Sequence, residues 1–92
     1  MATAKSGTKP QTFAFNAPGA ASVLLVGDFT QWQKRPIPMR RQLGGIWQVT
    51  VALPPGDHHY RFIVDGDWRD DPACPVQVAN PYGSQNAVRK VA

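Results

Sequence analysis

The sequence contains no glutamate, because all six acidic residues are aspartates. It has one cysteine, Cys74, which excludes an internal disulfide and is typical of the reducing cytoplasm. No apolar run approaches the roughly 20 residues that a membrane-spanning helix needs, and the start of the chain shows no signal-peptide pattern. We therefore expect a cytoplasmic protein without a membrane partner.

A helical period is also missing, since apolar residues never recur at helical spacing over a useful length. The 92 residues include nine prolines and eight glycines, which separate short apolar runs. This punctuation is typical of one all-β domain. The small, polar residues 1–9 predict a flexible N-terminal tail, and residues 10–92 a folded domain that we expect to be a monomer.

The net charge of +4 raises the question of a nucleic-acid partner. The basic residues form separate pairs, however, at Lys34-Arg35, Arg40-Arg41 and Arg89-Lys90. A groove that follows a phosphate backbone needs its cations gathered on one surface. We therefore expect no nucleic-acid partner.

Short alternating or apolar runs predict the strands. They cover residues 11–16, 22–26, 46–53, 58–65 and 87–91, with a broken edge strand over 34–41 and irregular chain from 72 to 81. Six to seven short strands with turns between them favour an immunoglobulin-like antiparallel β-sandwich. The alternative is a small barrel such as an oligonucleotide-binding fold.

The three tryptophans differ in their surroundings. Trp47 alternates with apolar residues in the strand 46–53, which predicts a core position. Trp32 follows the Gly27-Asp28 turn and Trp68 follows Asp65-Gly66, and both lie among polar residues. Either one could cap an end of the sandwich, but two such aromatics together favour a binding site.

A flat indole suits two kinds of partner, a nucleobase or a sugar ring. The sugar needs nearby groups that hydrogen-bond hydroxyls. Arg61 projects from the strand face opposite the core, and Ser84 and Asn86 lie near the C-terminal strand. Composition alone does not decide between the two partners.

The order of motifs along residues 11–91 resembles the family 48 carbohydrate-binding modules. The motifs are GDFTQW at 27–32, GIW at 45–47, LPPGDHHYRFIVDGDW at 53–68, DP at 71–72 and NPYGSQN at 80–86. Similar sequences are the glycogen-binding domain of the β subunit of AMP-activated protein kinase and the early-set (E-set) domains of branching and debranching enzymes.

The resemblance implies an E-set β-sandwich that binds α-1,4-glucans such as glycogen, starch and cyclodextrins. Trp32 and Trp68 match the family's two tryptophans that stack on glucose rings, and Arg61 matches its basic residue. Tyr82 takes the place of a large side chain that inserts against the glucan. Ser84 and Asn86 match the hydroxyl and amide that follow.

We expect no catalysis, cofactor or metal. The aspartates at 65, 67, 70 and 71 are interpreted as turn formers and partners of Arg69 rather than as a catalytic carboxylate pair. His58 and His59 are adjacent on a strand and point to opposite faces. The alternative function is a docking or targeting module associated with a glycogen-metabolising enzyme or a kinase complex, and the chain fits an accessory domain of a family 13 type glycoside hydrolase.

Overall fold

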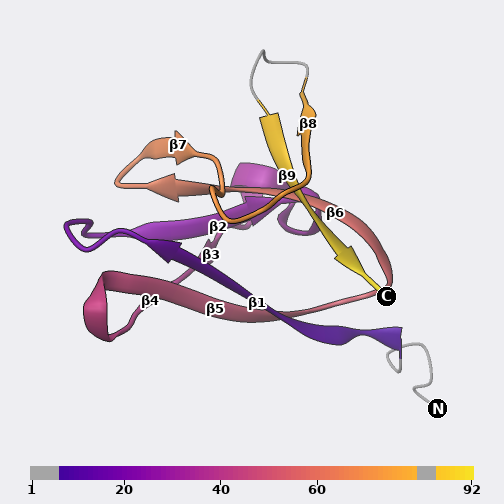
Figure 1. Ribbon diagram of the computed structural model, residues 1–92, viewed down its shortest axis with the longest axis horizontal. Helices are drawn as coiled ribbons and strands as arrows, with labels where there is room; N and C mark the ends of the chain where they lie inside the picture. The colour runs from indigo at the N-terminus through magenta and orange to yellow at the C-terminus, as the bar shows by residue number, and fades with distance from the viewer. Residues whose placement is uncertain (1–6, 81–84) are drawn as a thin grey trace.

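The computed structural model describes residues 7–80 and 85–92, and these are arranged almost entirely as antiparallel strands joined by turns (Figure 1). The strands are β1 (Lys9–Asn16), β2 (Val23–Gly27), β3 (Ile37–Pro38), β4 (Arg40–Arg41), β5 (Ile46–Leu53), β6 (Gly56–Val64), β7 (Asp67–Arg69), β8 (Gln77–Ala79) and β9 (Gln85–Val91). Short 3-10 turns connect some of them: η2 (Asp28–Thr30), η3 (Trp32–Lys34) and η4 (Leu43–Gly45). Most of the predicted tail, residues 1–6, lies outside the described part.

The strands form two sheets that face each other, which confirms the predicted β-sandwich (Figure 1). One sheet has the order β1-β5-β4. The other has the order β3-β2-β6-β9-β8, with β7 attached to β6. No α-helix occurs among the residues that the structure describes.

The described residues form nine strands, more than the predicted six to seven, for three reasons. Residues 67–69 after the Asp65-Gly66 turn continue as β7, which pairs with β6. The broken edge strand divides into β3 and β4, which pair in different sheets. Pro36 and Pro38 have no N–H to continue a ladder, so the chain crosses between the sheets there. The segment expected to be irregular contains β8, which pairs with β9. Strand β8 has only three residues, which are too few to show an alternation of apolar and polar residues in the sequence.

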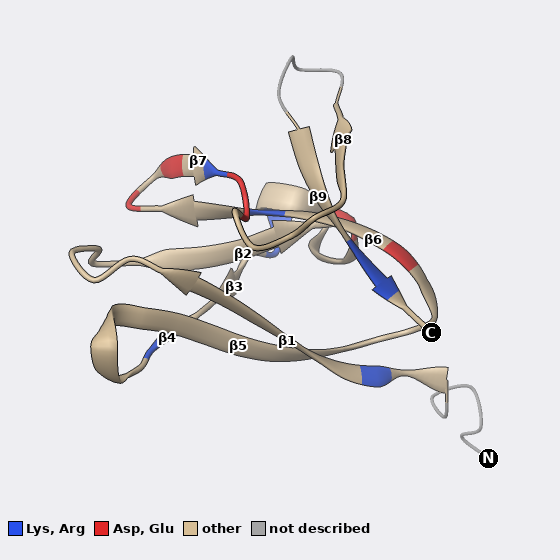
Figure 2. Ribbon diagram, in the orientation of Figure 1, with Lys and Arg blue, Asp and Glu red and all other residues tan. Residues whose placement is uncertain are grey.

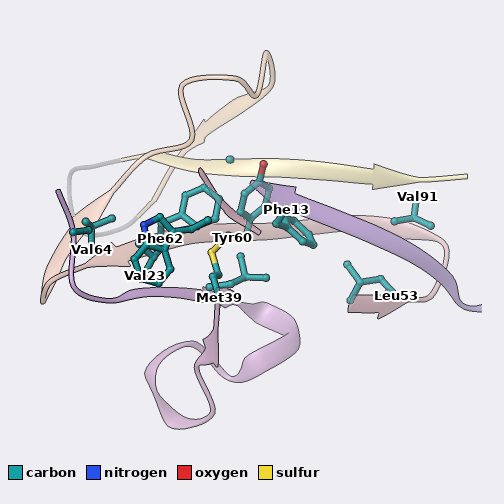
Figure 3. Packing of buried hydrophobic residues seen from close by; sticks show 12 residues of the cluster. Phe13, Val23, Met39, Leu53, Tyr60, Phe62, Val64 and Val91 are labelled. Atoms are coloured by element: carbon teal, nitrogen blue, oxygen red, sulfur yellow. The ribbon is translucent and has the colours of Figure 1, made fainter. Parts of the chain in front are cut away.

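The core lies between the two sheets and is built from alternate residues of the long strands (Figure 3). Phe13 on β1 and Phe62 on β6 are fully buried, as the alternation predicts. Trp47 is buried too, and its indole Nε1 donates a hydrogen bond to the Ala17 carbonyl at 2.9 Å. The core assignment of Trp47 is thereby confirmed.

One buried polar pair joins the core to the segment after β7. The Tyr60 hydroxyl donates a hydrogen bond to Asp71 Oδ2 at 2.6 Å, and Asp71 Oδ1 accepts the Ala73 N–H at 3.0 Å. Burial, followed by the bond to Asp71, raises the pKa of Tyr60 far above its ordinary value. Asp71 is therefore a structural residue, as the sequence predicts.

Replacing the hydroxyl tests this pair. Tyr60→Phe leaves a buried carboxylate without one of its donors, so we expect it to lower the free energy of unfolding at pH 7 by about 1.5–3 kcal/mol. Because the folded state raises the pKa of Tyr60, its contribution is complete below about pH 10 and is lost as pH rises further. Urea unfolding at pH 7 and pH 10.5 should show a smaller alkaline loss in the variant. Equal alkaline losses would contradict this account.

Candidate functional site

Trp32 is presented by a turn with unusual backbone conformation. Gln31 and Trp32 have φ values of 54° and 57°, a left-handed region that bulky residues rarely adopt. Thr30 is 3% exposed, and its hydroxyl accepts the Gly27 N–H at 2.9 Å and donates to the Trp32 carbonyl at 2.8 Å. Such a conformation costs about 1–3 kcal/mol and persists only where neighbouring groups hold it. Thr30 is one of those groups.

Trp68 is presented by a tight hairpin between β6 and β7. Asp65 and Gly66 have φ values of 49° and 88°, the positive values that a type I′ turn needs. The Asp65 carboxylate accepts the N–H groups of Ala21 and Ser22, both at 2.9 Å, which ties the hairpin to the start of β2. Trp68 comes immediately after this turn and lies within β7.

The structure brings these two tryptophans together on the outer face of the larger sheet. Trp68 pairs with Ile63 and is 37% exposed, and Trp32 is half-buried. Their ring centres lie 6.4 Å apart with an angle of 42° between the planes. The two indoles therefore form one angled aromatic surface.

Arg61 lies beside this surface. One edge of β6 pairs with β9 as far as Tyr60 and with β7 from Phe62 onward, so Arg61 falls between the two ladders. The centre of its guanidinium is 5.2 Å from the centre of the Trp68 ring, within the range of a cation–π contact. Its Nη2 lies 3.1 Å from Asp70 Oδ1. Asp70, expected to pair with Arg69, therefore forms its ion pair with Arg61.

Asn86 shares this face. Ala87, its neighbour in β9, points into the core, so alternation directs Asn86 outward like Arg61. The Asn86 side chain is buried, and its Oδ1 accepts a hydrogen bond from Asn80 Nδ2 at 3.0 Å. Tyr82 and Ser84 lie outside the described residues.

An apolar floor supports the site. By alternation Val26, Ile63 and Val88 point to the outer face, and none belongs to the core between the sheets, yet all three are buried. Val26 pairs with Arg61 and Ile63 with Trp68. In the sequence, the only sign of this floor is the continuous apolar run of β2, which is typical of a strand covered on both of its faces. Thr30 and Asp70 are the supporting residues that sequence reasoning missed.

Within 7–80 and 85–92, no group of three or more histidine, cysteine or acidic side chains is arranged to hold a metal ion. No helix among them is long and apolar enough to cross a membrane. Asp65 and Asp71, two of the clustered aspartates, serve as hydrogen-bond acceptors for the backbone or for Tyr60.

The family comparison identifies this β-sandwich as a carbohydrate-binding module. Residues 9–92 match the model of a family described as the glycogen recognition site of AMP-activated protein kinase. The chain belongs to this family, as its motifs predict.

Relatives from three kinds of protein share this module. The chain is 37% identical over 81 residues to the chloroplastic phosphoglucan phosphatase LSF1 of Arabidopsis thaliana, covering 88% of this chain and 14% of that protein. It is 36% identical over 87 residues to the 1,4-α-glucan branching enzyme GlgB of Synechococcus sp. (strain CC9605), covering 95% and 11%. It is 34% identical over 88 residues to the β-1 subunit of 5′-AMP-activated protein kinase from Sus scrofa, covering 96% and 68%. The chain thus spans about a tenth to a seventh of the first two relatives.

The Thr30 hydroxyl offers a test of how Trp32 is held. Thr30→Val keeps the shape but leaves the Gly27 N–H and the Trp32 carbonyl without this partner, so we expect a loss of about 1–3 kcal/mol in the free energy of unfolding. Thr30→Ser retains the hydroxyl and is the matched control, with a smaller loss expected. Urea unfolding followed by tryptophan fluorescence measures both variants. A valine variant as stable as the serine variant would argue against the hydroxyl's role.

Proposed function

We propose that this module binds α-1,4-glucans by stacking Trp32 and Trp68 on consecutive glucose rings. The observation that carries the proposal is the angled pair of indoles, 6.4 Å apart and tilted by 42°. A glucose ring has an apolar face of C–H groups, which an indole face covers well. The α-1,4 linkage curves the chain, so successive rings are tilted against each other. An angled pair of indoles suits such a ligand better than a flat platform does.

Polar groups beside the indoles would bind the hydroxyls. The guanidinium of Arg61 offers several donors in a fixed fork, and the amide of Asn86 offers both donor and acceptor. Both lie on the same sheet face as Trp68. Tyr82 and Ser84 are proposed as further contacts on the resemblance alone.

The affinity of such a site is expected to be modest. An open surface leaves most glucan hydroxyls in water, so we expect a Kd between about a micromolar and a millimolar. The proposed contacts all belong to one chain, so a monomer suffices. A nucleic-acid partner is disfavoured because the cation beside the indoles already has a carboxylate partner, which weakens any attraction for phosphates.

We also propose that the module acts as an accessory domain in a glucan-metabolising or kinase assembly. The support is that the segment similar to this chain covers 11% of a branching-enzyme relative and 14% of a phosphoglucan phosphatase. A docking role toward a protein partner is compatible with glucan binding. The cytoplasmic location stays a prediction.

Calorimetric titration with β-cyclodextrin tests the binding proposal. We expect saturable binding to the wild type, a loss of about 1–3 kcal/mol in Trp68→Ala by analogy with aromatic–base stacking, and no measurable binding in Trp32→Ala/Trp68→Ala. Leu43→Ala is the control, because Leu43 is exposed on η4, away from the larger sheet.

Two outcomes would count against stacking. If Trp68→Ala binds as tightly as the wild type, the indole is not part of the site. If the well-folded wild type gives no heat with cyclodextrin, the docking interpretation gains support, with the tryptophans as a surface for contact with a protein.

A further inference from the structure

Arg61 is held more firmly than an arginine on an open surface usually is. Its side chain is only 13% exposed, with the Trp68 ring at 5.2 Å and the Asp70 carboxylate at 3.1 Å. The apolar floor lies beside it, since Val26 pairs with Arg61 across the β2–β6 ladder. The guanidinium is therefore fixed in direction before any ligand arrives.

Asp70 owes its own position to the residue that follows it. Asp71 is buried and bound to the Tyr60 hydroxyl, which fixes the chain directly after β7. Asp70 stands one residue before that anchor and is 49% exposed, with its carboxylate against Arg61. In Figure 2 acidic positions lie before and after the one basic position of β7, so this end of the sheet carries mostly negative charge beside Arg61.

We propose that Asp70 is a positioning residue that fixes the Arg61 guanidinium beside Trp68 and offsets its charge, so that the site selects uncharged over phosphorylated glucans. This inference rests on the proposed function and names its ligand class more narrowly. Asp70 is not among the residues that the family resemblance assigns to the glucan site.

The selectivity follows from the chemistry of the pair. A guanidinium without a carboxylate partner binds phosphate through two parallel hydrogen bonds and would attract a phosphate ester on the glucan. With Asp70 in contact, a phosphate must displace the carboxylate or accept its repulsion. A sugar hydroxyl carries no charge, and it accepts a hydrogen bond from a remaining N–H without that cost. Asp70 therefore penalises the phosphorylated ligand only.

The test compares two probes, β-cyclodextrin and β-cyclodextrin 6-monophosphate, by calorimetric titration at one low ionic strength. For Asp70→Asn we expect β-cyclodextrin to bind about threefold more weakly, because an exposed ion pair that orders Arg61 contributes modestly. The phosphorylated probe should bind more tightly. The ratio of the two Kd values should shift about tenfold toward the phosphorylated probe.

Asp57→Asn is the matched control. It makes the same change in net charge as Asp70→Asn, at an exposed position of β6 that lies four residues from Arg61 and opposite Lys90. We expect its Kd ratio to equal that of the wild type. Lys34, an exposed cation close to Trp32 in the chain, is unchanged in every variant, so its effect cancels in the comparison.

A second pair of proteins shows whether Asp70 acts through Arg61. In an Arg61→Gln background, adding Asp70→Asn should leave the Kd of β-cyclodextrin unchanged and should shift the Kd ratio less than it does when Arg61 is present, since coupled residues give non-additive effects. A full Asp70→Asn effect without Arg61 would overturn the positioning role, and so would an unaltered Kd ratio in Asp70→Asn itself. Failure of the wild type to bind β-cyclodextrin is a different result, which removes the proposed function.

Discussion

The hydrogen bond between the Tyr60 hydroxyl and the Asp71 carboxylate links the core of this domain to the outer face that carries Trp68 and Arg61. Tyr60 points into the core from β6, and its neighbour Arg61 points to the opposite face. Asp71 follows directly on Asp70, the partner of Arg61. One buried bond of 2.6 Å thus fixes both ends of the Arg61–Asp70 pair and the strand that carries Trp68. The proposed site depends on the core for its geometry, because its residues are spread over separate strands and the η3 turn.

The two tryptophans illustrate different ways of exposing a large aromatic side chain. Trp68 lies on a hairpin whose type I′ turn is favourable for Asp-Gly, so its presentation costs little. Trp32 requires two consecutive residues with positive φ, and the buried hydroxyl of Thr30 helps to hold them. Unfavourable backbone of this kind persists where the surrounding structure over-determines it, often at functional sites. The positive-φ conformation places the indole of Trp32 beside that of Trp68, and this placement is a reason for the conformation to be kept.

Much of the fold could be predicted because strand alternation is local. The span 46–53 and the inward positions of Tyr60, Phe62 and Val64 follow from period-two patterns alone. Strand β8 could not be predicted, since its three residues become a strand only by pairing with β9. At the site, Trp32 and Trp68 differ from core aromatics by their polar neighbours, so sequence indicates them. Their mutual distance, and the choice of Arg61 over Arg69 as the partner of Asp70, depend on which strands lie side by side.

Arg61 and Asn86 are more buried than Trp68, and this order has an energetic reason. Arg61 and Asn86 already have protein partners at 3.1 and 3.0 Å, so binding would not need to freeze flexible side chains. Hydrogen bonds to sugar hydroxyls replace equally good bonds to water and contribute little once such freezing is subtracted. Because the side chains of Arg61 and Asn86 are already held by the protein, the small free-energy gain from their hydrogen bonds to sugar hydroxyls is not lost to ordering. The indoles supply the apolar contact. β6, its neighbouring strands and the η2–η3 turns contribute every described residue of the proposed site, so these residues belong to one continuous part of the domain. Similar sequences, at 34–37% identity, occur in a kinase subunit, a branching enzyme and a phosphatase.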